Sequence, residues 1–238
     1  EILNENITAF EAGYGFRSKK VSLNANGYYT SWKNKPFPFG VKVPDPDDPT
    51  EFVTANVNGM DALHMGVEVD VSYRVHKKLT LEGMVSVGDW TWQSSEILDV
   101  LGTEIEFDAK GVHVGDAAQS TYAASVRYGF IKNGYVKLKY TYFDRYYSNF
   151  DPFTLTGENG GKESWLIPSY GLMSLHAGYR VQFEKSSLNF KANIFNVLNS
   201  LYISDARTNQ NGTNFDANSA GVFIGQGVRF NASVGFQF

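Results

Sequence analysis

The chain has 238 residues, of which 42% are hydrophobic and 15% are aromatic, and it contains no cysteine. The lack of cysteine excludes disulfide frameworks and thiolate metal sites, and a formal net charge of −4 offers no basic face for nucleic acid. The mean hydropathy is −0.29, and no segment approaches the roughly 18 consecutive apolar residues of a membrane helix. A chain of this composition can cross a membrane only with strands, whose apolar residues alternate with polar ones.

Nine long segments alternate between apolar and polar residues, and each predicts a strand. In chain order they cover 6–17, 21–33, 61–76, 79–93, 118–131, 135–149, 170–183, 188–203 and 225–238. Soluble strands are typically about 5 to 6 residues long, whereas a strand that crosses a bilayer needs about 9 to 11. Several segments exceed both lengths. We therefore predict an all-β fold, an antiparallel transmembrane β-barrel.

The connections between these segments alternate between short and long. The short ones cover 18–20, 77–78, 132–134 and 184–187, and Asn133-Gly134 is the best hairpin signal among them. The long ones cover 34–60, 94–117, 150–169 and 204–224, and they hold all seven prolines. Outer-membrane barrels have short periplasmic turns and longer extracellular loops, which is the same alternation.

One face of the predicted strands is apolar and the other is charged. In the third segment, Val67 and Val69 share one face, while Glu68 and Asp70 share the other. A Lys or Arg on the lipid face of a barrel costs about 2 to 4 kcal/mol at the bilayer midplane, so in a barrel the charges point inward. The residues that we predict to face the lumen are Glu68, Asp70, Arg74, Arg127, Lys137, Lys139, Lys191 and Arg229. In a soluble sandwich the same face would meet solvent, and the pattern alone does not separate the two.

The last segment alternates up to a terminal phenylalanine. Phe230, Val234, Phe236 and Phe238 fall on one side and polar residues on the other. This ending resembles the signal by which outer-membrane proteins are recognised for insertion, although a soluble sheet could also end this way. Nine strands are an odd number, whereas bacterial single-chain barrels have even numbers. We therefore expect the chain to begin within a barrel, with residues 1–4 in an extracellular loop.

Aromatic residues gather in the long connections and at the strand ends beside them. We predict ligand contacts from Trp90, Trp92, Tyr146, Tyr147 and Trp165, with Trp32, Phe37, Phe39 and Phe150 as further candidates. Trp90 and Trp92 lie on the same face of one strand end and could stack a flat ligand together. Trp and Tyr also anchor barrels at membrane interfaces, so an aromatic girdle is the alternative for each residue.

Signals for metal ions and for enzymatic chemistry are weak. Asp45, Asp47 and Asp48 could offer oxygen ligands to calcium, but their spacing fits no complete loop motif, which favours a solvated loop. The four histidines are scattered singly, with no pair at metal-ligand spacing. We predict no catalytic residues, no metal site and no cofactor, and hence no enzyme.

Several segments together resemble the C-terminal half of TonB-dependent outer-membrane receptors. They are Asn6–Tyr14, Gly66–Asp70, the Ala-Asn-Ile-Phe-Asn block that runs from Ala192 to Tyr202, and the terminal Phe238. Two further segments, at 28–35 and 111–119, resemble the Bacteroidota branch of that family. The resemblance implies residues 1–238 as the C-terminal segment of a larger barrel of about 22 strands with a plugged lumen. The plug domain and the N-terminal barrel strands are absent from this chain.

The resemblance also implies a function and a set of partners. It implies energised import of a scarce nutrient across the cell outer membrane, with the TonB complex pulling on an N-terminal box; siderophore, haem, cobalamin, oligosaccharide and peptide all fit as substrates. The expected partners are outer-membrane lipid, the N-terminal part of the same receptor with its plug, the TonB complex and a surface lipoprotein. The lumen-facing charges would then bind the plug through hydrated polar contacts, the alternative being a solvated lumen. A passive porin segment and a soluble all-β carbohydrate-binding domain remain as alternative functions.

Overall fold

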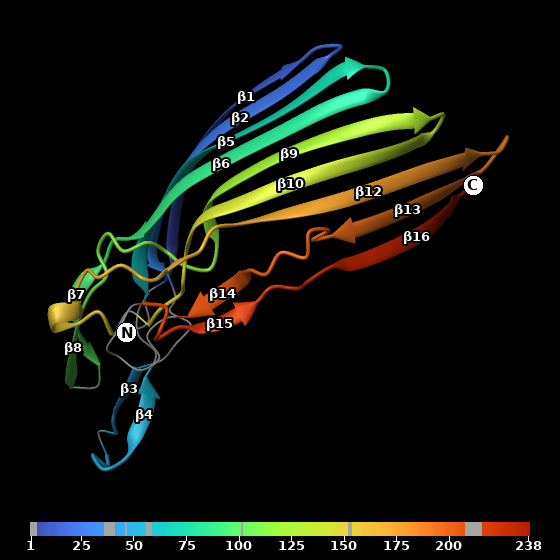
Figure 1. Ribbon diagram of the computed structural model, residues 1–238. Helices are drawn as coiled ribbons and strands as arrows, with labels where there is room; N and C mark the ends of the chain where they lie inside the picture. The colour runs from blue at the N-terminus through green and yellow to red at the C-terminus, as the bar shows by residue number, and fades with distance from the viewer. Residues whose placement is uncertain are drawn as a thin grey trace.

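The protein is built around one antiparallel sheet in which each long strand pairs with the next. The computed structural model describes residues 4–35, 41–45, 47–55, 59–100, 102–151, 154–207 and 216–238. The nine long strands are β1 (Asn6–Arg17), β2 (Val21–Lys35), β5 (Met60–His76), β6 (Leu79–Trp92), β9 (Ala118–Ile131), β10 (Gly134–Tyr147), β12 (Tyr170–Gln182), β13 (Ser187–Phe195) and β16 (Arg229–Gln237). Their order in the sheet is their order in the chain, with β1 and β16 at its two edges (Figure 1).

These strands confirm the nine that the alternation predicts, with clear differences in length at the last two. The ninth segment, predicted from residue 225, begins at Arg229. The eighth segment, predicted to run to residue 203, ends at Phe195. Asn196 and Asn199 follow with φ values of 50° and 51°, a left-handed conformation that asparagine tolerates better than most residues. The Asn196 side chain holds the turn, because its Oδ1 accepts from the Ser200 N–H at 2.8 Å and its Nδ2 donates to the Gln226 carbonyl at 3.1 Å.

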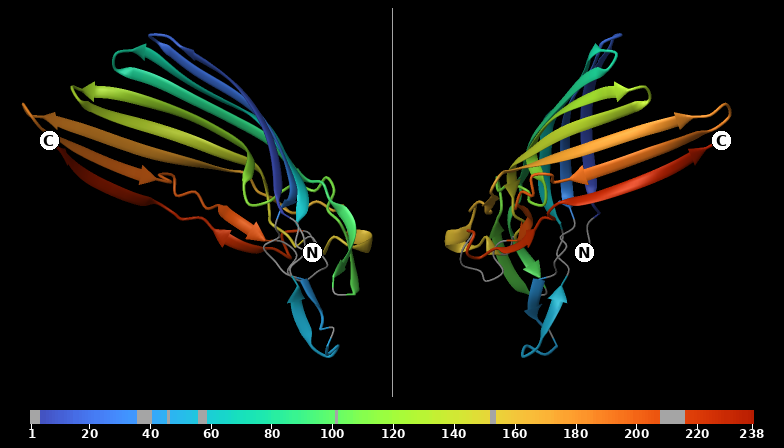
Figure 2. Two further views of the ribbon diagram at one scale, coloured as in Figure 1. Left: turned by 180° about the vertical axis from the view of Figure 1, so that it is seen from behind. Right: turned by 45° about the vertical axis from the view of Figure 1, so that its right-hand side comes forward.

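The long connections carry secondary structure of their own. Three separate hairpins form from β3 (Val41–Pro44) with β4 (Phe52–Ala55), β7 (Ser95–Val100) with β8 (Thr103–Asp108), and β14 (Ile203–Arg207) with β15 (Gly221–Ile224). The 3-10 turn η2 (Gly157–Asn159) precedes β11 (Leu166–Ile167), which pairs with β10. All of these elements lie at one end of the sheet, which we call the loop end; the short turns lie at the other, the turn end (Figures 1 and 2).

The sheet is curved, and its two faces differ in chemistry. On one face large apolar side chains remain exposed along the strands, for example Val85 at 42% and Phe230 at 83%. On the other face Lys137 of β10 forms an ion pair with Glu82 of β6, although β9 lies between the two strands. Side chains two strands apart meet only where they converge, so the polar face is the concave face and the apolar face is the convex face.

A hydrophobic core lies beneath the loops, at the loop end. We call it the loop core, and its buried members are Met60, Ala62, Trp92, Phe107, Ala109, Val112, Val114, Phe150 and Leu155. It joins the ends of β5 and β6 to the connection that precedes β9 and to the connection that follows β10. No helix within the described part of the chain is long and apolar enough to cross a membrane.

Candidate binding site at the loop end

Aromatic rings cover the concave face where β2, β5 and β6 approach the loop end. The register aligns Tyr28 with Gly66, and Gly66 with Gly88. A Cβ atom on Gly66 would lie 2.5 Å from the Tyr28 hydroxyl, and one on Gly88 would lie 2.6 Å from Trp90 Nε1. The two glycines therefore leave the space across which both rings lie, and the Trp90 indole donates to the Tyr28 hydroxyl at 2.9 Å.

A histidine and a lysine complete this aromatic group. The His64 ring stacks on Trp90 with 5.4 Å between ring centroids, and it contacts Trp32 at 6.0 Å. The ammonium of Lys35 lies 5.1 Å from the centroid of the Trp32 ring and 5.5 Å from that of Trp92, distances at which a cation is attracted to an aromatic face. We call Tyr28, Trp32, His64 and Trp90 the aromatic cluster. It offers flat, partly exposed surfaces beside a cation.

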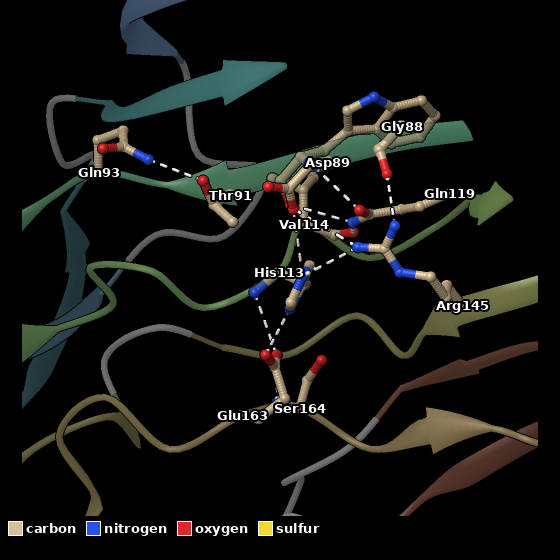
Figure 3. Close-up of polar contacts among 11 residues, drawn as sticks. Gly88, Asp89, Thr91, Gln93, His113, Val114, Gln119, Arg145, Glu163 and Ser164 are labelled. Atoms are coloured by element: carbon tan, nitrogen blue, oxygen red, sulfur yellow. Dashed lines mark hydrogen bonds and ion pairs between the residues drawn. The ribbon is translucent and has the colours of Figure 1, made fainter. Parts of the chain in front are cut away.

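Beside the aromatic cluster, three charged side chains from different elements meet around His113 (Figure 3). His113 Nδ1 lies 2.5 Å from Glu163 Oε2, and its Nε2 lies 3.4 Å from Asp89 Oδ1. Arg145 places its Nη2 atom 3.5 Å from the same Asp89 oxygen and donates from Nη1 to the Gly88 carbonyl at 2.8 Å. The network ties the ends of β6 and β10 to the connections that follow β8 and η2.

Two further contacts fix this network in place. The Tyr147 ring stacks on His113 with parallel planes and 4.1 Å between centroids. Gln119, which is 1% exposed, accepts from the Trp90 N–H at 2.9 Å and donates to the carbonyls of Trp90 and Val114. Gln119 thereby replaces ladder hydrogen bonds where β6 and β9 separate, and it satisfies backbone groups that would otherwise be costly to bury.

The predicted ligand-contact residues divide into exposed and buried groups. Trp92 is 8% exposed within the loop core, so it packs rather than presenting a stacking surface with Trp90. Tyr146 is 7% exposed, and its hydroxyl donates to the Ser204 carbonyl at 3.0 Å. Trp90, Tyr147 and Trp165 keep partial exposure. Phe37 and Phe39 lie outside the described residues.

A pocket of about 380 Å³, lined by two aspartates and by Arg207, lies farther along the loop end, beside β14 and β15. Asp116 and Asp205 both line it, and Asp116 Oδ2 accepts from the Asn149 side chain at 2.9 Å. The pKa of Asp116 is raised, first because the surrounding chain limits hydration of its carboxylate and then because the Asp205 carboxylate is near. Among the described residues, no group of three or more His, Cys, Asp or Glu side chains is placed to hold a metal ion.

The register places all the predicted lumen-facing residues on the concave face. Arg74 pairs with Thr80 of β6, and Thr80 pairs with Arg127 of β9, so the two arginines lie on the same face. Arg127 in turn pairs with Lys137 of β10. The remaining members on the same face are Glu68, Asp70, Lys139, Lys191 and Arg229. On the opposite, convex face, Phe230, Val234 and Phe236 of β16 are exposed beside the apolar residues of β13, and Phe238 follows the strand.

The sequence alone does not reveal the residues of the charged network as a group. His113 appears there as an isolated histidine, and Gln119, Arg145 and Glu163 carry no motif. The paired glycines at 66 and 88 are the one usable signal, because small residues on a polar strand face leave room for aromatic rings from neighbouring strands. That signal requires the register, which only the structure gives.

Comparison with known proteins identifies the barrel. A family model described as "TonB dependent receptor-like, beta-barrel" matches residues 4–197. The chain resembles the ferric yersiniabactin uptake receptor FyuA from Yersinia pestis, with a TM-score of 0.63 and 16% identity over 100% of this chain and 31% of that one. It also resembles the copper transporter OprC, with a TM-score of 0.66 and 15% identity over 100% and 32% of the two chains.

A third solved structure, the FrpB iron transporter from Neisseria meningitidis, has a TM-score of 0.61 and 16% identity, over 98% of this chain and 31% of that one. At these identities the likeness is one of fold. The chain spans about a third of the length of these structures. No curated protein gave a significant sequence match.

Proposed function

Because the chain belongs to the TonB-dependent receptor-like β-barrel family, we propose that it is the C-terminal segment of a barrel that imports a scarce nutrient. Receptors of this family are outer-membrane β-barrels, and the exposed apolar residues of the convex face are the surface that meets lipid. The family is one of receptors and not of enzymes. A soluble carbohydrate-binding domain would not leave such a face exposed over strand after strand.

The observation that carries the proposal is the difference between the two faces of one long-stranded, curved sheet. The convex face is apolar, whereas the concave face holds charges, the aromatic cluster and the His113 network. Edge strands β1 and β16 each pair on one side only among the described strands. An open sheet edge is not tolerated in lipid, so the remaining barrel strands would pair with these edges.

The interior of such a barrel would hold a plug. The lumen-facing charges would contact it through hydrated hydrogen bonds, which loosen under force at less cost than a buried apolar contact. The partners that we propose are therefore the N-terminal part of the same receptor with its plug, and the TonB complex that supplies energy. A surface lipoprotein would contact the loop end.

The substrate would meet the loop end first. The structural relatives are described as receptors or transporters for ferric yersiniabactin, copper and iron. Partly exposed rings beside Lys35 and Arg145 would suit a flat or anionic nutrient. Among the candidates, which are siderophore, haem, cobalamin, oligosaccharide and peptide, siderophores and haem fit this description. We assign the first contacts to Trp90, Tyr147 and Trp165, and a supporting role to Trp92 and Tyr146.

Growth of the host bacterium on limiting nutrients tests this proposal. Strains that lack the receptor, and strains that lack TonB, should both lose growth on the same nutrient among those candidates. Trp90→Leu should weaken uptake of that nutrient, whereas Tyr122→Leu on the convex face should leave uptake unchanged. Uptake that needs the receptor but not TonB would instead identify a passive channel.

A further inference from the structure

The short turns at the turn end carry a positive charge that the chain as a whole does not have. Over the whole chain, 25 acidic residues outnumber 21 basic ones. The short turns reverse this balance, because their one acid is Glu184, whereas their cations are Lys19, Lys20, Lys77, Lys78, Lys132 and Lys185. We call these six lysines the lysine rim.

The members of the lysine rim are exposed and have no acidic partner. All six residues are exposed to solvent, and none of them forms an ion pair with any residue that the structure describes. Elsewhere in the same sheet Lys33 is paired with Asp61, and Lys137 with Glu82. Unneutralised like charges that lie close together create a positive potential, which attracts anions.

Backbone hydrogen bonds hold the turns in a row. The Lys20 carbonyl accepts from the Arg74 N–H of β5 at 2.7 Å, and the Lys78 carbonyl accepts from the Gly129 N–H of β9 at 2.7 Å. The Asn133 carbonyl accepts a third such bond, at 3.0 Å, from β12. Each of these turns is therefore bonded to the next hairpin, and the lysines follow one another in a fixed order, while their flexible stems leave each ammonium free to move.

A row of tyrosines lies on the convex face beside the lysine rim. It consists of Tyr73 of β5, Tyr128 of β9 and Tyr179 of β12, which are all exposed, and the register places each opposite apolar residues of neighbouring strands. Exposed tyrosines are typical of the level at which a bilayer meets water. Tyr73 and Tyr128 each lie four residues before a turn lysine, which in a tilted strand is about 10 Å along the membrane normal. Lysine stems can extend along such a surface and place the ammonium among headgroup phosphates.

We propose that the lysine rim binds the headgroups of anionic phospholipids in the leaflet at the turn end. The inference rests on the proposed function, because it requires the convex face to meet lipid. A leaflet presents phosphates all along the edge of a barrel, which matches cations distributed over four turns. A small anion in solution would meet only one turn. Groups of about four to eight cations beside a membrane attract anionic lipids through the negative potential of the bilayer surface.

Photo-cross-linking of the full-length receptor in lipid vesicles tests the contact at each turn separately. The vesicles consist of phosphatidylcholine with a small fraction of a probe, either phosphatidylglycerol or phosphatidylcholine, that carries a diazirine on the acyl chain next to the glycerol. Peptide mass spectrometry then measures the yield at each turn. We expect about tenfold more product from the phosphatidylglycerol probe at a turn with two lysines, since one lysine near an anionic surface changes binding by roughly fivefold. Equal yields from the two probes would overturn the inference.

Removal of charge from one turn provides a second measurement. In Lys77→Gln/Lys78→Gln, the yield of phosphatidylglycerol product at this turn should fall about tenfold, whereas the yield at residues 132–134 of the same molecule should not change. Lys110→Gln/Lys162→Gln is the matched control, because it removes two charges at the loop end. An unchanged yield in the first variant, or an equal fall in the control, would contradict the inference.

A conservative variant separates the effect of charge from an effect on the turn itself. Lys77→Arg/Lys78→Arg keeps both charges, so it should keep the yield of the unmutated receptor. Electrophoresis without heating, in which a folded barrel migrates apart from its unfolded chain, checks that each variant is folded. A folded arginine variant with as little product as the glutamine variant would show that charge does not attract the lipid, and the inference would be wrong.

The two proposals fail in different ways. A receptor whose uptake depends on TonB, but whose turns give equal yields with both probes, contradicts only the lipid assignment. A receptor whose turns prefer the phosphatidylglycerol probe, but whose uptake does not depend on TonB, contradicts only the transport mechanism.

Discussion

Single glycines determine which rings can cover the concave face. A Cβ atom at Gly66 would lie 2.5 Å from the Tyr28 hydroxyl and 2.7 Å from the Val87 carbonyl oxygen. The side chain could move, but the backbone oxygen belongs to a paired strand. We expect Gly66→Ala to cost about 1 to 3 kcal/mol, the range for overpacking. A folded barrel and its unfolded chain run as separate bands in electrophoresis. The temperature at which half of the folded band is lost measures the change in stability. Gly15→Ala, whose nearest contact would be at 3.5 Å, should be near neutral, and equal losses would contradict the explanation.

Two aspartates at the loop end should respond to pH in opposite directions. The pKa of Asp116 is raised by limited hydration and by Asp205, so its stabilising contribution is complete below the unfolded pKa and is lost as pH rises through the folded one. Asp116→Asn should therefore stabilise the loop end at neutral pH. It keeps an acceptor for Asn149, and asparagine tolerates the φ of 72°. Since the side chain also reaches solvent, the gain is small.

Asp48 provides the opposite case. Hydrogen bonds from the Thr50 hydroxyl at 2.7 Å and from the Thr50 N–H lower the pKa of Asp48. Its contribution is present above the unfolded pKa and is lost as pH falls through the folded one. Asp48→Asn should therefore loosen the β3–β4 hairpin at neutral pH. Both variants are tested by their rates of protease cleavage relative to the unmutated protein, at about pH 4 and about pH 7. At neutral pH, Asp116→Asn should be cleaved more slowly and Asp48→Asn faster. Cleavage rates that change in the same direction in both variants would refute this account.

At the scale of elements, neighbouring residues of one strand should tolerate charge differently. Val85 lies midway along β6 on the convex face, whereas Ser86 lies on the concave face, where its hydroxyl donates to Glu68 Oε1 at 3.3 Å. Val85→Lys should cost about 2 to 4 kcal/mol of barrel stability because it places a cation in lipid. Ser86→Lys should cost far less, since its ammonium would meet Glu68. Urea titration of the receptor in lipid vesicles measures both, and similar losses would contradict the assignment of faces.

The strands could be predicted from the sequence because their signal is local. Alternation within each segment determined the faces, and Asn133-Gly134 marked a hairpin turn whose first residue has a φ of 62°. The three loop-end hairpins and the end of β13 were not predicted. Their segments are short, and the bend after Phe195 depends on contacts from Asn196 to Ser200 and Gln226. Alternation carries no information about such contacts.

At the scale of the whole molecule, the two ends of the sheet should lie in different compartments. The chain contains no cysteine, so single cysteines can report on each end of this segment. Thr50→Cys in the β3–β4 hairpin should react with an impermeant maleimide on intact cells. Lys132→Cys at the turn end should react only after the outer membrane is permeabilised. Labelling of both positions on intact cells would contradict the expected orientation.

The candidate site was less predictable than the fold because it is assembled across the sheet. Trp90 was predicted from its position at a strand end, but its contacts with Tyr28 and Gln119 depend on the register. Trp92 has the same parity as Trp90, and only the packing of the connections over it shows that it is buried. The charges on the concave face were more accessible to prediction, because parity alone determines which side of a strand they occupy.

The loop core has a consequence for the order of assembly. Among the long strands of the main sheet, each pairs only with those that precede and follow it in the chain, so the sheet can grow by one hairpin at a time. The loop core instead joins Met60 and Trp92 to Phe150 and Leu155, and such distant contacts form only after the intervening chain has been ordered. The loop core therefore forms after β5, β6, β9 and β10 have paired. A defect in the pairing of these strands would leave the loop end without its packed core.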